Sequence, residues 1–127
     1  MRAAGVLWLL LLSPLVAAAA EIVITTDALT PAVLTVAADE PVVYVNRSGR
    51  IVHVDFLGRT GEHQVFQVPG SIRAIFHGPG RHPYVVHFEE PRRGELRGVV
   101  EVEEAREPRA EQPACRGISV EGSCLEP

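Results

Sequence analysis

Short apolar stretches alternate with turn-forming residues between positions 21 and 103 of the chain. Clusters of Gly, Pro, Asn and Asp recur there about every 8 to 12 residues, a spacing typical of all-β sandwiches and barrels. The stretches between them are rich in Val, Ile, Phe and Tyr, which strands prefer. The pattern predicts an all-β fold of about eight strands. They are expected at residues 22–26, 33–36, 42–46, 51–56, 64–68, 72–76, 83–88 and 97–102.

The first 20 residues have the pattern of a secretory signal peptide. Met1-Arg2 precedes an apolar block from Gly5 to Val16, and four alanines follow as a small-residue cleavage site. The block is short for a membrane span, and no later stretch approaches the roughly 20 apolar residues that a span needs. We therefore expect residues 1–20 to be removed, leaving a periplasmic or secreted protein with no membrane span.

The composition changes after Val102. Residues 103–113 are charged, contain two prolines and have no apolar period, which is typical of a linker. The sequence thus predicts a domain at 21–104, followed at 105–127 by an acidic linker and a short irregular tail. Cys115 and Cys124 lie in that tail, and in an exported protein such a pair is expected to form a disulfide. A pair of thiolate ligands for Cu(I) or Zn is the alternative.

Charge and motifs exclude several classes of function. The formal net charge is −4 and no basic strip is present, so no nucleic-acid partner is expected. Neither Ser48 nor Ser71 lies in a nucleophile-elbow context, and there is no phosphate-binding glycine loop. Enzyme activity would require a metal with an open position that activates water. The chain is therefore expected not to be an enzyme.

All the histidines lie in one third of the chain. They are His53, His63, His77, His82 and His87. Imidazole is the side chain that most often ligates copper, zinc, nickel or iron, so the clustering favours a metal site. The competing interpretation is that some of these histidines only cap turns or lie on solvent-exposed faces.

The order of the fragments resembles the cupredoxin family. The matching fragments are Glu-Ile-Val-Ile at 21–24, Leu-Thr-Pro at 29–31, Leu-Thr-Val at 34–36, Val-Val-Tyr-Val-Asn at 42–46, Ser-Gly at 48–49, Pro-Gly at 79–80, Tyr84, and Leu-Arg-Gly-Val-Val-Glu-Val at 96–102. The resemblance covers most of residues 21–103. It implies an eight-stranded Greek-key β-sandwich whose metal ligands come from loops at one end.

The chain departs from that family where a blue-copper site needs its thiolate. Such a site combines one Cys and two His ligands, usually with a weak axial Met. When the chain is compared with the cupredoxin pattern, Val86 occupies the position of the copper-ligating Cys, and Leu96 lies near the position of the axial Met. Blue-copper electron transfer is therefore not expected.

The remaining candidate ligands lie on the predicted strands. Side chains alternate between the two faces of a strand. On the first strand, His53 and Asp55 are therefore expected to point away from the core, and Val52, Val54 and Phe56 into it. On the second, His87 is expected to point away from the core, and Tyr84, Val86 and Phe88 into it. The family topology makes His53 and His87 cross-strand neighbours, close enough to chelate one ion, with Asp55 as a further oxygen ligand. His82 is expected on the core-facing side of its strand. It would be either a metal ligand or a core histidine with one hydrogen-bond partner. His63 and His77 are expected to be loop residues.

The sequence thus predicts metal binding by His53, His87, His82 and Asp55. Copper is the expected ion, with zinc as the other candidate. The predicted protein is exported and handles or senses the metal rather than passing electrons. The alternative is a metal-free cupredoxin-like module that binds a protein partner or is structural, with the linker and tail as its interaction element.

Overall fold

The computed structural model describes Gly5 and residues 19–57, 65–67, 70–89, 94–107 and 114–126, with residues 65–67 described by their backbone alone. Most of the predicted signal peptide lies outside these residues, as do His63 and linker residues 108–113. Strand β1 begins at Ala20, one residue before the expected start of the mature chain.

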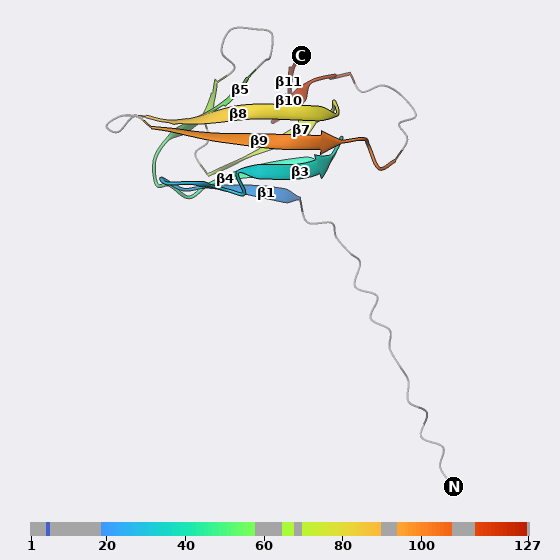
Figure 1. Ribbon diagram of the computed structural model, residues 1–127, viewed down its shortest axis with the longest axis horizontal. Helices are drawn as coiled ribbons and strands as arrows, with labels where there is room; N and C mark the ends of the chain where they lie inside the picture. Colours follow the sequence, from blue (N-terminus) through green and yellow to red (C-terminus); the bar gives the residue numbers. More distant parts are fainter. Residues whose placement is uncertain are drawn as a thin grey trace.

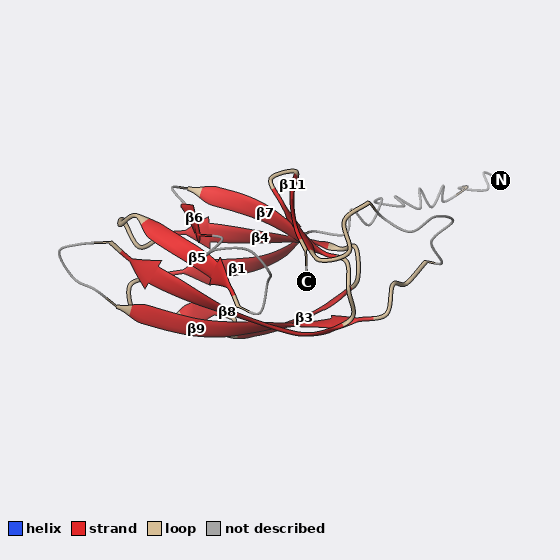
Figure 2. Ribbon diagram, turned by 90° about the horizontal axis from the view of Figure 1, so that it is seen from above, coloured by secondary structure: helices blue, strands red, loops and turns tan. Residues whose placement is uncertain are grey.

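The described residues form two sheets packed face to face (Figure 1). The six-stranded sheet has the order β11-β10-β7-β4-β1-β2, and the five-stranded sheet has the order β3-β9-β8-β5-β6. Figure 2 shows the two layers, with β7, β4 and β1 in one and β9, β8 and β3 in the other. In chain order the strands are β1 Ala20–Ile24, β2 Leu29–Thr30, β3 Val33–Ala37, β4 Pro41–Asn46, β5 Val52–Phe56, β6 Val65–Gln67, β7 Ser71–Phe76, β8 Gly80–Phe88, β9 Glu95–Glu103, β10 Ile118–Val120 and β11 Ser123–Leu125.

The predicted all-β sandwich is confirmed, and each of the eight predicted strands has a counterpart. Strand β1 runs parallel to β4, and β3 runs parallel to β9; the other pairs are antiparallel. Strand β2 was not predicted because two residues are too few for a periodic pattern. No helix among the described residues is long and apolar enough to cross a membrane.

Side-chain alternation fills the space between the sheets. The inward residues of β5 and β8 are at most 6% exposed, as predicted: Val52, Val54, Phe56, Tyr84, Val86 and Phe88. Aromatic rings continue across the core, with Tyr44 edge-on to Phe56 and Tyr84 at centroid distances of 6.0 and 5.2 Å. Full burial of one such side chain is worth roughly 1.5–3 kcal/mol, so the two sheets hold each other mainly through this layer.

A glycine makes room for the largest of these rings. Gly98 of β9 lies opposite Tyr84 of β8. A Cβ atom built on Gly98 would overlap the Tyr84 ring, so the ring occupies the volume that any other residue would fill. The glycine thus fixes how deeply Tyr84 enters the core.

The predicted irregular tail is wrong, because residues 118–125 form a hairpin that extends the six-stranded sheet. Strand β10 pairs with β7 on one side and β11 on the other. Ile118, Val120 and Leu125 are each no more than 3% exposed and belong to the hydrophobic core. Alternation of apolar residues around Glu121-Gly122, both at positive φ, explains the hairpin. Three-residue strands are too short to distinguish from loop by pattern alone.

Candidate functional site

His53 and His87 lie directly opposite each other on the outer face of the five-stranded sheet. They form a register pair between the antiparallel strands β5 and β8, which confirms the predicted neighbourhood. The flanking inward residues Val54 and Val86 are fully buried. Side chains in such a pair have Cβ atoms roughly 4.5–5.5 Å apart, a spacing that places two imidazoles within reach of one ion.

Each of the two imidazoles has a carboxylate partner. His53 Nε2 lies 2.6 Å from Glu89 Oε1, and His87 Nδ1 lies 3.6 Å from Glu95 Oε1. The His53 side chain is 23% exposed and that of His87 is 40% exposed. A metal-binding histidine commonly uses one ring nitrogen for the metal and donates from the other to a carboxylate. Among the described residues, Nδ1 of His53 and Nε2 of His87 take no part in these carboxylate contacts.

The loop after β8 holds Glu89 beside the pair. The Glu89 backbone N donates to Ile51 O at 3.1 Å, and its backbone O accepts from Arg50 Nη2 at 2.6 Å. The Arg50 guanidinium also lies 4.9 Å from the centroid of the Phe88 ring. These contacts fix the backbone from which the Glu89 carboxylate reaches His53. We call His53, His87, Glu89 and Glu95 the paired-histidine face.

The structure separates the other predicted ligands from this pair. Asp55 is on the same strand face as His53 but one row further along, opposite Val85 and roughly 6–7 Å away by strand rise. His82 is five positions before His87 on β8, or about 16 Å away along the strand. Its Nε2 lies 2.7 Å from Gly78 O and its ring packs 5.3 Å from that of Phe76. His63 lies outside the described residues.

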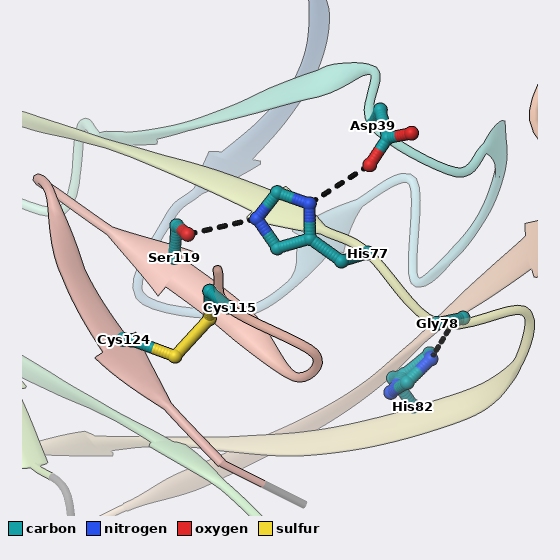
Figure 3. Close-up of polar contacts among 7 residues, drawn as sticks. All are labelled: Asp39, His77, Gly78, His82, Cys115, Ser119 and Cys124. Atoms are coloured by element: carbon teal, nitrogen blue, oxygen red, sulfur yellow. Dashed lines mark hydrogen bonds and ion pairs between the residues drawn. A yellow bond between two sulfur atoms is a disulfide. The ribbon is translucent and has the colours of Figure 1, made fainter. Parts of the chain in front are cut away.

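Sequence reasoning missed the role of His77. Its Nδ1 is 2.8 Å from Asp39 Oδ1 and its Nε2 is 2.8 Å from Ser119 Oγ, as Figure 3 shows. His77 therefore joins the turn before β4, the end of β7 and strand β10. The residues are 38 and 42 positions apart in the sequence, so no local signal could have linked them. We call these three residues the His77 clasp.

The His77 clasp has the connectivity of a Ser-His-Asp triad, but its surroundings suit a structural role. The His77 side chain is only 13% exposed, and Ser119 belongs to a strand paired on both sides. The backbone N–H groups of a strand that is paired on both sides point at its neighbouring strands. Acyl transfer by a Ser-His-Asp triad instead needs N–H groups that point at the oxyanion formed during the reaction. The clasp holds the hairpin against the turn before β4.

The predicted disulfide is confirmed at the same end of the sandwich. Cys115 and Cys124 are bonded, with their Cα atoms 5.6 Å apart. Glu126 Oε1 lies 3.2 Å from Cys124 Sγ. The chain has only these two cysteines, so no cysteine thiolate is present elsewhere in the oxidised protein.

Two buried tyrosines of the core have clearly shifted pKa values. Burial raises the pKa of Tyr44 well above its ordinary value, and the neighbouring Tyr84 adds to the shift. Burial likewise raises the pKa of Tyr84. Neither buried hydroxyl has a hydrogen-bond partner among the described residues. Both tyrosines are therefore held neutral inside the sandwich.

No family model and no curated protein matches the sequence. Solved structures do match the fold. A purple cupredoxin from Nitrosopumilus maritimus superposes with a TM-score of 0.51 at 20% identity, over 66% of this chain and 99% of that one. A reduced variant of amicyanin gives 0.52 at 26% identity, over 69% and 86%. A Cu(I) form of a second amicyanin variant gives 0.51 at 25%, over 67% and 82%. The chain has a cupredoxin-like fold.

Proposed function

We propose that this is an exported cupredoxin-like protein that binds Cu(II), or another divalent metal, through His53 and His87 and serves in metal handling or sensing. The single observation that carries the proposal is the direct pairing of the two imidazoles, each beside a carboxylate. Glu89 and Glu95 would keep the rings oriented and raise their basicity as ligands. The copper-binding amicyanin neighbour adds support for the choice of ion.

Electron transfer through a thiolate-ligated copper does not fit the residues present. Both cysteines are consumed by the disulfide, and Val86 is fully buried in the apolar core. Leu96, opposite Val86 on β9, also packs against that core. Apolar side chains thus fill the positions that the family resemblance assigned to Cys and Met. A site built from two imidazoles would be open to water and would exchange its metal readily.

Calorimetric titration of metal-free protein with Cu(II) tests the proposal. We expect one ion per chain and no intense thiolate-to-copper absorption. His53→Ala and His87→Ala should each weaken binding at least about tenfold, or roughly 1.4 kcal/mol. The double variant should lose less than the sum, because either loss already breaks the chelate.

The conservative variants Glu89→Gln and Glu95→Gln should weaken binding by about tenfold or less, since they alter the orientation and basicity of the rings but remove no ligand. His82→Ala is the matched imidazole control at the far end of β8, and it should bind as the parent does. Absence of binding at neutral pH, or equal loss in the His82 control, would overturn the proposal.

A second candidate function is a metal-free module that binds a protein partner. The observation that favours it is that both imidazoles already have carboxylate partners, so the face is satisfied without an ion. Under this alternative, the cross-strand row of His53, His87 and Glu95, with Arg97 beside Glu95 in the next row, would be a polar recognition surface. A failed copper titration combined with an intact fold would favour this candidate.

A further inference from the structure

The disulfide and Glu126 gather three ligand atoms at the hairpin. The two Sγ atoms and one Glu126 carboxylate oxygen all lie within 4.8 Å of one another. This is the one group of three such His, Cys, Asp or Glu atoms in the part of the chain that the structure describes. In the oxidised protein the sulfurs bond to each other, so they offer no thiolate to a metal.

The hairpin has a frame that does not depend on the disulfide alone. Strand β10 is hydrogen-bonded to β7 and β11, and Ile118 and Leu125 are buried in the core. The backbone N of Arg73 donates to Glu121 Oε1 at 2.7 Å, and the His77 clasp holds Ser119. With this frame intact, reduced thiols whose Cα atoms are 5.6 Å apart stay within reach of one ion, because metal–thiolate bonds are about 2.3 Å long.

We propose that reduction of Cys115–Cys124 opens a site for a soft metal ion, Cu(I) or Zn(II), with the two thiolates and the Glu126 carboxylate as ligands. An external dithiol supplies two electrons and two protons. The S–S bond breaks, Cys115 and Cys124 become thiols, and the reductant becomes a disulfide. Each thiol then releases its proton as its sulfur binds the metal. The site goes beyond the proposed function and shares no residue with the paired-histidine face.

The exposure of the two cysteines indicates which sulfur a reductant attacks, and the ligand type indicates which ion the reduced site binds. Cys124 is exposed whereas Cys115 is only 8% exposed, so an incoming thiolate reaches Cys124 Sγ more easily. Thiolates select Cu(I) and Zn over harder ions, whereas imidazoles accept Cu(II). The redox state of the disulfide would thus decide whether the hairpin end holds a soft metal ion, and the paired-histidine face would bind Cu(II) in either state.

Titration with Cd(II) before and after reduction by a phosphine tests this inference. Cadmium substitutes for zinc, and its ultraviolet thiolate-to-metal absorption reports sulfur ligation only, so binding at the histidines does not interfere. The reduced protein should develop this absorption up to one ion per chain, and the oxidised protein should not. Zinc competition against a chromophoric chelator then gives the affinity.

Three variants complete the test. Cys115→Ser combined with Cys124→Ser should abolish the absorption and weaken Zn(II) binding at least about a hundredfold. Glu126→Gln should weaken it about tenfold, and the exposed control Glu104→Gln should not change it. The proposal is overturned if the reduced parent binds no more tightly than the double serine variant, if Glu126→Gln binds as the parent does, or if circular dichroism shows that reduction alone unfolds the protein.

Discussion

The two ends of the sandwich use the same residue type in opposite ways. At the paired-histidine face, His53 and His87 are partly exposed on a strand surface, each beside one carboxylate. At the hairpin end, His77 is largely buried and bridges two polar partners from distant segments. An imidazole with both ring nitrogens engaged inside the fold joins segments, whereas one with a ring nitrogen directed outward is available for a ligand. Burial and partners, and not histidine content, therefore distinguish the structural histidine from the two that we propose as metal ligands.

The largest effect is expected when the hairpin end is removed. Truncation after Glu104 deletes Ile118, Val120 and Leu125 from the core, each worth roughly 1.5–3 kcal/mol. Domains of this size have only about 5–15 kcal/mol of stability, so the truncated chain should be largely unfolded. Chemical denaturation with circular dichroism checks this result. A cooperative transition within about 1 kcal/mol of the parent would show the hairpin to be dispensable.

A paired histidine comparison sharpens the contrast between the ends. His77→Ala removes both hydrogen bonds of the His77 clasp at a largely buried position, and should lower the free energy of unfolding by about 1–3 kcal/mol. His53→Ala and His87→Ala remove partly exposed contacts and should each cost less than about 1 kcal/mol. Urea denaturation of the three variants gives the values. Equal costs at both ends would contradict the division of roles.

A substitution in the core between the two ends should change the free energy of unfolding by a smaller amount. Tyr44→Phe removes a buried hydroxyl without a partner and should leave stability unchanged or raise it by up to about 1 kcal/mol. Burial holds the Tyr44 pKa above its ordinary value of 10.0, so the unfolded state loses its phenol proton first as pH rises. The free energy of unfolding should therefore be constant below about pH 10 as far as Tyr44 is concerned, and should decrease as the pH rises above that value. The decrease should be smaller in Tyr44→Phe, which lacks this phenol. Denaturation curves at neutral and alkaline pH measure both effects.

The sequence predicted the parts of the fold that repeat a local pattern. Alternation placed Val52, Val54 and Phe56 inward and His53 outward, and the structure confirms this arrangement. The topology implied by the cupredoxin resemblance paired His53 with His87 across two strands, and the structure confirms that pairing. Alternation works there because each strand is at least five residues long, and every inward residue of 52–56 on β5 and of 84–88 on β8 is buried.

The rest depended on contacts that no local pattern records. The strand at 118–120 was not predicted, because it has only three residues and follows a charged linker. It pairs with β7, which lies more than 40 residues earlier in the chain. His77 lies in the loop after β7, as expected, but its partners Asp39 and Ser119 come from segments 38 residues before it and 42 residues after it, so the sequence did not reveal them. The carboxylates of Glu89 and Glu95 were also missed, because Glu95 meets His87 through the β8–β9 register and Glu89 is held by contacts with Arg50 and Ile51, which no local pattern records.

Pulsed electron paramagnetic resonance of the Cu(II)-loaded protein tests the central claim most directly, because it counts the imidazoles bound to the ion. We expect two equatorial imidazoles in the parent, one in His53→Ala, one in His87→Ala and two in His82→Ala. A spectrum that is the same in the parent and in both paired-histidine variants would contradict the account.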